Sequence, residues 1–318
     1  MNSNNNPPRL AIVVPCYNEE AVLTETNTRL TGLLQDLSDK SKITPDSFIV
    51  YVNDGSKDQT WSLICQLQQQ DSHVRGVKLA HNAGHQNALM AGLESFKADA
   101  DAMVTIDADL QDDVNAISAM VDAYLKGADI VYGVRKERTT DTMFKRTTAL
   151  AFYKLMAVMG TDTVYNHADY RLMSRRAVEA LCEYPERNLF LRGLVPLLGF
   201  TTENVYYDRA ERFAGESKYP FSKMLAFAID GITSFSIKPI TIIFVIGLLC
   251  FIVGLLALGW GLYSYFMGTV VPGWTSLLVS LWLIGGVVIT SLGVIGQYIG
   301  KIYIEVKHRP RYHIEKIV

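Results

Sequence analysis

The sequence lacks charged side chains over a long internal stretch. Residues 239–300 contain no Asp, Glu, Lys, Arg or His, although 19% of the 318 residues are charged. Two apolar segments, 240–267 and 275–300, each exceed the ~20 residues that a helix needs to cross a bilayer, and the break between them contains Gly and Pro. We predict a two-helix transmembrane hairpin within residues 238–305. The alternative is a buried hairpin in a soluble core.

A basic excess, paired cysteine spacings and an N-terminal apolar segment are also absent. The formal net charge of −2 argues against a nucleic-acid partner, which normally binds a basic surface. The four cysteines show no paired spacing, as expected for reduced thiols in the cytosol. No apolar stretch typical of a secretory signal follows the first residues, and we expect residues 1–8 to be disordered.

Positive charge lies on both sides of the uncharged stretch. Lys238 precedes it, and residues 306–318 are predicted to form a basic cytoplasmic tail after it. By the positive-inside rule, both ends of the hairpin face the cytoplasm. We therefore predict a multi-pass membrane protein whose termini and main domain, residues 9–220, are cytoplasmic. Two spans per chain also favour homo-oligomers, because they pack more easily with partners.

The first part of the chain alternates between apolar runs and helical patterns. The apolar runs occupy residues 9–15, 48–54, 74–80, 101–107 and 128–134, and the helical patterns occupy residues 20–37, 59–70, 85–97 and 114–126. Continuous apolar strands are buried on both faces, which is typical of parallel sheets built from βαβ units. We predict an α/β domain with a mostly parallel sheet.

Polar residues follow each of the first four predicted strands. The segments are PCYNEE, NDGSKDQT, HNAGHQNA and TIDADLQDD. Because ligands of such sheets bind at the carboxyl ends of the strands, we expect these segments to form one site. For Asp54, roles in ligand binding and in a turn are both open, whereas Asp58 is interpreted as a helix cap.

The most acidic of these segments contains Asp107. If the chain stays extended, Asp107, Asp109 and Gln111 lie on one side, because side chains alternate along a strand. Three oxygen ligands of this kind suit Mg²⁺ or Mn²⁺, and a cation would relieve the repulsion between the carboxylates. Asp112 and Asp113 lie where the next helix is predicted to begin, so we interpret them as helix-capping residues.

Six motifs occur in an order that resembles a known enzyme family. They are VVPCYNEE, VNDGSKDQT, HNAGHQNALMAGL, TIDADLQDD, DYRLMSR and RFAGESKYPFSK. The chain resembles the inverting family 2 glycosyltransferases that load a sugar onto a polyprenyl phosphate. These include dolichol-phosphate mannose synthases, and the nearest branch is the bactoprenol (undecaprenyl-phosphate) glucosyltransferases. Asp113 and Val114 stand where that branch usually has two prolines.

The resemblance implies a GT-A (Rossmann-like) nucleotide-sugar transferase domain and roles for individual residues. The implied nucleotide-sugar-binding residues are Pro15, Tyr17, Glu19, Asp54, Gly84, Gln86 and Asp107. The implied metal ligands, for Mg²⁺ or Mn²⁺, are Asp107, Asp109 and Gln111, and the implied catalytic residues are Asp107, Asp109 and Asp169. The cation would stabilise charge on the departing diphosphate as a Lewis acid.

The resemblance also assigns residues to the phosphate of the acceptor lipid. These are Arg135, Arg212, Ser217 and Lys218, with Arg146 as a weaker candidate. The alternative for the segment around Lys218 is a basic loop attracted to anionic lipid. Basic, apolar stretches at residues 144–159 and 221–237 suit interfacial amphipathic helices, and ordinary packed surface helices are the alternative.

The resemblance implies inverting transfer of a hexose, most simply glucose from UDP-glucose, to undecaprenyl phosphate at a bacterial inner membrane. The β-linked product would serve cell-envelope glycans such as the lipopolysaccharide O-antigen. A phosphate monoester with a second pKa of ~6 is already largely a dianion. Asp169 is therefore open to three interpretations: a base, a residue that orients the substrates, or an ion-pair partner of Arg171 or Arg175. Alternatives for the whole chain are another donor, GDP-mannose or a UDP-aminosugar, and a non-catalytic membrane-anchored binding module.

Overall fold

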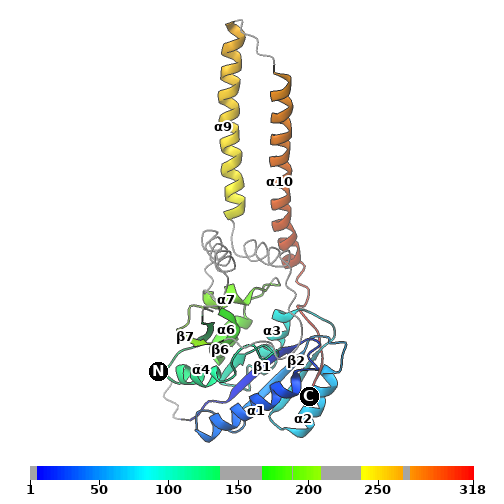
Figure 1. Ribbon diagram of the computed structural model, residues 1–318, viewed down its shortest axis with the longest axis vertical. Helices are drawn as coiled ribbons and strands as arrows, with labels where there is room; N and C mark the ends of the chain where they lie inside the picture. Colours follow the sequence, from blue (N-terminus) through cyan, green and yellow to red (C-terminus); the bar gives the residue numbers. More distant parts are fainter. Residues whose placement is uncertain (1–5, 137–166, 188, 209–237, 268–272) are drawn as a thin grey trace. The chain divides into compact units, whose positions relative to one another are not determined.

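The computed structural model describes residues 6–136, 167–187, 189–208, 238–267 and 273–318. The chain divides into two compact units. The first contains the strands, the shorter helices and Arg309–Val318, and the second contains the two long helices labelled α9 and α10 in Figure 1.

An eight-stranded sheet forms the centre of the first unit, in the order β7-β5-β6-β4-β1-β2-β3-β8. The strands are β1 (Leu10–Cys16), β2 (Phe48–Asn53), β3 (Val74–Leu79), β4 (Ala102–Thr105), β5 (Ile130–Arg135), β6 (His167–Ser174), β7 (Thr202–Tyr207) and β8 (Ile314–Ile317). β1 is parallel to β2 and β4, β2 to β3, and β5 to β7. β6 is antiparallel to β4 and β5, and β8 to β3. The predicted mostly parallel sheet and its first five strands are confirmed, and β6 to β8 are additional.

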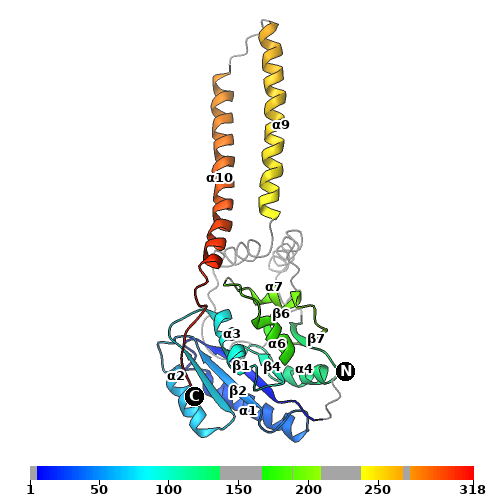
Figure 2. The same cartoon turned by 180° about the vertical axis from the view of Figure 1, so that it is seen from behind.

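Different helices cover the two faces of this sheet (Figure 1, Figure 2). The helices are α1 (Leu23–Asp39), α2 (Thr60–Gln70), α3 (His85–Phe96), α4 (Ala116–Leu125), α6 (Arg175–Cys182) and α7 (Leu191–Leu197). Side chains of α1, α2 and α4 share one core with Leu10, Ile12 and Val14 of β1. α3 packs on the opposite face, where Gly92 meets Val13. The four predicted helices are confirmed, with small shifts at their ends.

The C-terminal segment adds the edge strand β8 to the sheet. β8 pairs with β3, and the Arg311 guanidinium donates to Glu94 of α3 at 2.6 Å. The Tyr312 hydroxyl donates to the other oxygen of the Glu94 carboxylate. The prediction of a basic tail at residues 306–318 therefore did not include the strand β8. Four exposed residues carry no pattern of their own, and β8 depends on the free edge that β3 offers.

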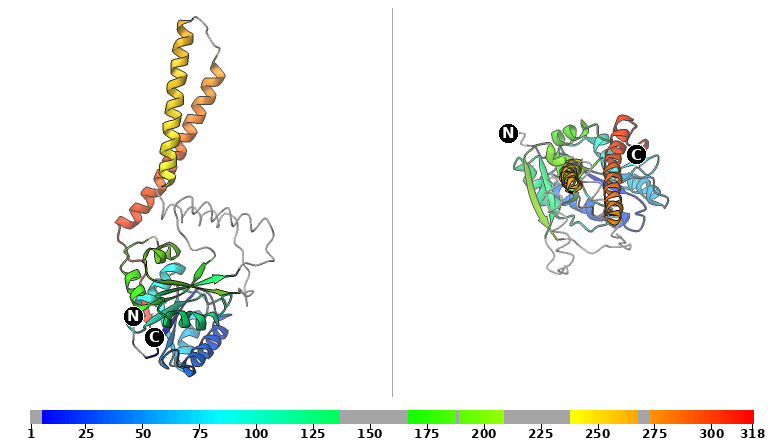
Figure 3. Two further views of the ribbon diagram at one scale, coloured as in Figure 1. Left: turned by 90° about the vertical axis from the view of Figure 1, so that its left-hand side faces the viewer. Right: turned by 90° about the horizontal axis from the view of Figure 1, so that it is seen from above.

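The second unit contains α9 (Lys238–Phe266) and α10 (Trp274–Val306), which lie side by side (Figure 1, Figure 3). Large apolar side chains such as Phe244 and Leu281 are exposed along both helices. Within the described residues, Ile284–Val306 is the one helical segment long and apolar enough to cross a membrane by length and composition. The transmembrane hairpin stays a prediction.

Gly92 provides a test of the packing between α3 and the sheet. A Cβ atom there would lie 2.4 Å from Val13 Cγ1 and 2.9 Å from Val52 Cγ2. We expect Gly92→Ala to lower the free energy of unfolding by about 1–3 kcal/mol, because overpacking outweighs the gain in helix propensity. Thermal unfolding of the full chain in detergent measures this. The control is Gly32→Ala in α1, where a Cβ meets nothing within 4 Å; equal midpoints for the two variants would contradict the packing.

Candidate active site

Loops after β1, β2, β3 and β4 meet at the carboxyl edge of the sheet. The Asn18 amide donates to Ser56 Oγ at 3.0 Å, and the Glu19 amide donates to Thr60 Oγ1 at 2.9 Å. These bonds join the loop after β1 to the loop after β2. The Asp58 carboxylate accepts from the Thr60 amide at 3.1 Å, but the cap position of α2 is Gln59, so Asp58, which the sequence predicted as the cap, lies one residue before it.

Asp54 organises the loop that leads into α3. Its two carboxylate oxygens accept from the Ala83 amide at 2.6 Å and the Gly84 amide at 3.0 Å, and the residue is 3% exposed. Gly84 has φ 93°, a conformation that favours glycine. Tyr17 is 43% exposed beside this loop cluster, whereas Pro15 is buried in β1. Contacts of these residues with a nucleotide stay predictions.

The acidic loop, residues 106–113, begins where β4 ends. Its partly exposed polar side chains are Asp107, Asp109, Gln111 and Asp113. Its buried residues are Ile106, Ala108, Leu110 and Asp112. The predicted alternation is confirmed in burial, but the chain is not extended, because Leu110 has φ 56°. Such a conformation costs a non-glycine residue roughly 1–3 kcal/mol and is found most often at functional sites.

His85, the first residue of α3, lies between two predicted catalytic carboxylates. Its Nε2 is 3.4 Å from Asp107 Oδ1 and 3.9 Å from Asp169 Oδ2. The structure thus brings Asp107 and Asp169 together, as expected, and adds His85, which the sequence analysis did not select although it belongs to the NAGHQ motif. Although 37% of the Asp107 side chain is exposed, loss of surrounding water raises its pKa to about 6, and His85 opposes this shift.

Asp169 pairs with two arginines. Arg171 Nη2 donates to its Oδ1 at 2.6 Å, and Arg192 Nη2 donates to its Oδ2 at 3.2 Å. Burial alone would raise the pKa of Asp169, but Arg192 and Arg171 together hold that pKa well below its usual range. A carboxylate that binds protons so weakly is a poor base. The pairing of Asp169 with Arg171, which the sequence left open, is confirmed. Arg192 belongs to none of the six motifs, so the sequence did not indicate its role.

Asp112 is not a helix-capping residue. α4 begins only at Ala116, and the Asp112 side chain, 1% exposed, accepts from Arg135 Nη2 at 3.0 Å and from the Tyr207 hydroxyl at 2.6 Å. The predicted cap is wrong because the chain makes a further turn before the helix. This buried cluster of Asp112, Arg135 and Tyr207 connects the acidic loop to the ends of β5 and β7.

The predicted acceptor residues are only partly within the described chain. Arg135 pairs with Asp112, and 24% of its side chain is exposed. Its contact with a lipid phosphate stays a prediction. Arg146, Arg212, Ser217, Lys218 and the two stretches predicted as interfacial helices lie outside the described residues.

The acidic loop offers oxygen ligands of the type that a hard divalent cation prefers. Among the described residues, no group of three His, Cys, Asp or Glu side chains is arranged to hold a metal ion. Mg²⁺ and Mn²⁺ need fewer protein ligands than three, because they commonly bind one or two carboxylates together with water and substrate phosphate oxygens. The carboxylates of Asp107 and Asp109 and the amide of Gln111 fit such a set. The raised pKa of Asp107 comes mainly from lost hydration, and the nearby carboxylates of Asp112, Asp169 and Asp109 add to it; a cation would compensate that negative charge.

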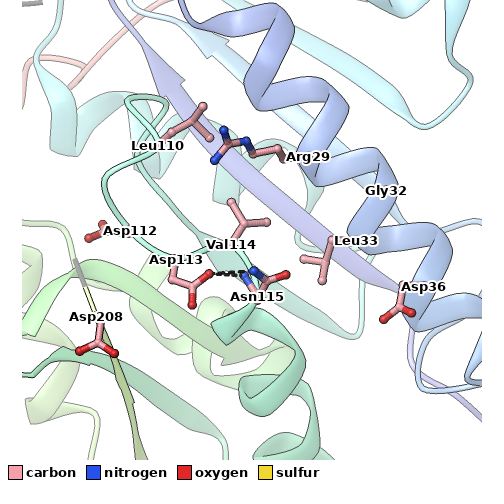
Figure 4. Close-up of a pocket in the computed structure, with 10 residues that line it drawn as sticks. All are labelled: Arg29, Gly32, Leu33, Asp36, Leu110, Asp112, Asp113, Val114, Asn115 and Asp208. Carbon is pink, nitrogen blue, oxygen red and sulfur yellow. Dashed lines mark hydrogen bonds between the residues drawn. The ribbon is translucent and has the colours of Figure 1, made fainter. Parts of the chain in front are cut away.

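A pocket of about 700 Å³ lies between α1 and residues 110–115 (Figure 4). Arg29 and Leu33 of α1 line one side, and Asp113 lines the other. Asp113 Oδ1 accepts from the Asn115 amide at 3.0 Å, but the cap position of α4 is Asn115, so the predicted cap at Asp113, two residues earlier, is also wrong. Neither Asp107 nor Asp109 lines this pocket, so it is separate from the predicted donor site.

Tyr207 tests the buried cluster. Tyr207→Phe removes the hydroxyl that donates to Asp112 and accepts from Arg135 Nε at 3.2 Å, while the Arg135–Asp112 pair remains. We expect the free energy of unfolding to fall by about 1.5–3 kcal/mol, the usual value for a hydrogen bond to a charged group. Chemical unfolding of the full chain in detergent measures it. Tyr206→Phe is the matched control, because the neighbouring Tyr206 is 61% exposed; the cluster has no stabilising role if the two variants unfold alike.

Comparisons with known proteins agree with this geometry. The family model Glycosyl transferase family 2 matches residues 11–182. The chain is 50% identical to the uncharacterized glycosyltransferase YkoT of Bacillus subtilis, over 97% of this chain and 91% of that protein. It is 40% identical to the SfII prophage-derived bactoprenol glucosyl transferase of Shigella flexneri, over 97% and 98%.

A solved structure, glucosyl-3-phosphoglycerate synthase from Mycobacterium tuberculosis, is a more distant match. Its identity is 22% and its TM-score 0.45, over 71% of this chain and 78% of that one. A TM-score this low does not establish a shared fold, so the assignment depends on the sequence matches. By those matches the chain belongs to glycosyl transferase family 2 and is a glycosyltransferase.

Proposed function

We propose that this enzyme transfers glucose from UDP-glucose to a polyprenyl phosphate such as undecaprenyl phosphate, with inversion at the anomeric carbon. The observation that carries the proposal is the meeting of Asp107 and Asp169 around His85, beside Asp109, at the carboxyl edge of the sheet. The acceptor is supported by relatives about 40% identical over nearly the whole chain that are named bactoprenol glucosyl transferase.

The donor side is formed by the loops after β1 to β4. Tyr17 and Glu19 face the base and ribose, and the loop held by Asp54 adjoins them. Gly84 lets the chain enter α3 next to the sugar diphosphate. A divalent cation, Mg²⁺ or Mn²⁺, when bound to the acidic loop, neutralises the negative charge that grows on the leaving diphosphate.

The transfer step needs no general base. The acceptor phosphate is largely a dianion at neutral pH, because its second pKa is ~6. One of its oxygens forms a bond to the anomeric carbon, the bond from that carbon to the diphosphate oxygen breaks, and the electron pair leaves with UDP. Attack from the face opposite the diphosphate converts an α-linked donor into a β-linked product. The low pKa of Asp169 is compatible with this scheme, since no proton has to be removed.

Membrane attachment places the reaction beside its lipid acceptor. The exposed apolar side chains of α9 and α10 support a hairpin in lipid, and Lys238 and Lys301 near its ends support a cytoplasmic orientation. The headgroup of a polyprenyl phosphate lies at the same surface. The enzyme therefore acts at the cytoplasmic face of the bacterial inner membrane.

A donor screen tests the reaction. Purified full-length enzyme is mixed with undecaprenyl phosphate, Mg²⁺ or Mn²⁺, and UDP-glucose, GDP-mannose or a UDP-aminosugar, and lipid products are identified by mass. We expect a monohexosyl phospholipid with UDP-glucose. If a lipid product forms only with another donor, the sugar of that donor would replace glucose in the proposed reaction. Binding of UDP-glucose with no lipid product from any donor would favour a non-catalytic binding module.

Asp109 tests the metal assignment. We expect Asp109→Asn to lower kcat/KM for UDP-glucose by about 100-fold or more, because one charged ligand of the cation is lost. The measurement is the initial rate over a series of Mn²⁺ concentrations. The matched control is Asp113→Asn, four residues further along the same loop, where the carboxylate bonds Asn115. Equal rates for the two variants would exclude Asp109 as a ligand.

The pKa of Asp107 predicts how cation binding depends on pH. With a pKa of about 6, this carboxyl is ionised above pH 6 and protonated below it. A proton must then be displaced by the cation, so we expect the apparent Mn²⁺ affinity to fall about fivefold between pH 6 and pH 5 and to approach a tenfold fall per pH unit below that. Calorimetric titration with Mn²⁺ measures this, and Asp107→Asn should bind weakly with little pH dependence. A flat wild-type profile would show that Asp107 does not hold the cation.

A further inference from the structure

The backbone just before Arg192 is held in place by two hydrogen bonds of Leu191. The amide of the preceding residue, Leu191, donates to Gln86 Oε1 at 2.9 Å, and the Leu191 carbonyl accepts from Arg171 Nη1 at 3.2 Å. Gln86 belongs to α3 and Arg171 to β6, so the first turn of α7 is joined to both. The guanidinium of Arg192 is then fixed by Asp169.

Two arginines lie against Asp169, one buried and one partly exposed. Arg171 and Asp169 form a buried ion pair, with side chains 2% and 9% exposed, which is neutral by itself. Arg192 adds a second positive charge, and 33% of its side chain is exposed. His85 places this group next to Asp107, because one imidazole nitrogen lies within 4 Å of both carboxylates. The site thus presents a pre-positioned, partly exposed guanidinium beside the acidic loop.

We propose that Arg192 binds a phosphate group of the reacting substrates, and that Asp169 is the positioning residue that holds it. This rests on the proposed function, in which both substrates carry phosphate. A guanidinium offers a planar set of N–H donors that matches phosphate oxygens, and less orientational freedom is lost when it is already fixed. In this role Asp169 acts through Arg192, and the transfer proceeds without proton removal by Asp169.

Two phosphates can occupy this position, and kinetics separates them. One is the phosphate monoester of the acceptor, and the other is the diphosphate of the donor. We expect Arg192→Gln to raise KM for one substrate by about 10- to 100-fold, the effect of losing a hydrogen bond between charged groups. A higher KM for undecaprenyl phosphate alone identifies the acceptor. A higher KM for UDP-glucose, together with weaker UDP binding, identifies the donor.

A double-mutant cycle tests the link between the two residues. We expect Asp169→Asn to raise the same KM, and the double variant to be little worse than Arg192→Gln alone, because both changes remove one phosphate contact. Arg192→Lys should recover part of the affinity. The control is Arg29→Gln, which breaks an exposed Arg–Glu pair on α1. Thermal unfolding of each variant shows whether it is folded. If Arg192→Gln fails to fold, Arg192→Lys takes its place in the cycle.

Three outcomes would overturn the inference. They are an unchanged KM for both substrates in Arg192→Gln, a loss confined to kcat in Asp169→Asn, and multiplicative losses in the double variant. Either of the last two outcomes would instead support a role of Asp169 as a general base. A wild-type enzyme that makes no lipid product counts against the proposed function. Arg192 is then judged by calorimetric binding of UDP and of inorganic phosphate, where equal affinities of wild type and Arg192→Gln would again reject its role.

Discussion

Asp54, Asp107, Asp109, Asp112 and Asp169 lie at one edge of the sheet, and the folded chain has to compensate their negative charge. The compensation differs for each environment. Asp54 accepts two backbone amides, whereas the buried Asp112 and Asp169 pair with arginines. Asp107 faces the open side with His85 as its neighbour and keeps a raised pKa. The carboxylates that the protein pairs hold neighbouring groups in position, and those that it leaves partly uncompensated are suited to a cation.

α3 connects most of these groups. At its start, the amide of Gly84 binds Asp54, His85 lies between two carboxylates, and Gln86 binds the backbone of α7. Near its end, Glu94 receives Arg311 and Tyr312 from the segment that follows α10 in the sequence. Since Gly92 fits closely against β1, a displacement of this helix would disturb the loop held by Asp54, the candidate active site and the C-terminal segment together.

The arrangement fits a transfer that depends on charge rather than on proton removal. An acceptor that arrives as a dianion needs a positive group to orient it. The diphosphate that leaves the donor needs a cation to stabilise its charge. The pairing of Asp169 with two arginines supplies the first requirement through Arg192, and the acidic loop supplies oxygen ligands for the second. Family 2 membership shows that the chain is a glycosyltransferase, and this division of charge is compatible with the proposed acceptor.

Local patterns in the sequence determined the first five strands, the four helices between them and the edge where the site lies, because continuous apolar runs and helical periodicity are properties of neighbouring residues. They also determined the alternation of Asp107, Asp109 and Gln111. Tertiary structure alone decided the rest. β8 needs the free edge of β3, Asp112 changes from an expected cap to a buried ion pair only when Arg135 and Tyr207 meet it, and Arg192 reaches Asp169 from 23 residues away. These contacts depend on how distant segments pack in space, and the spacing of residues along the chain does not predict them.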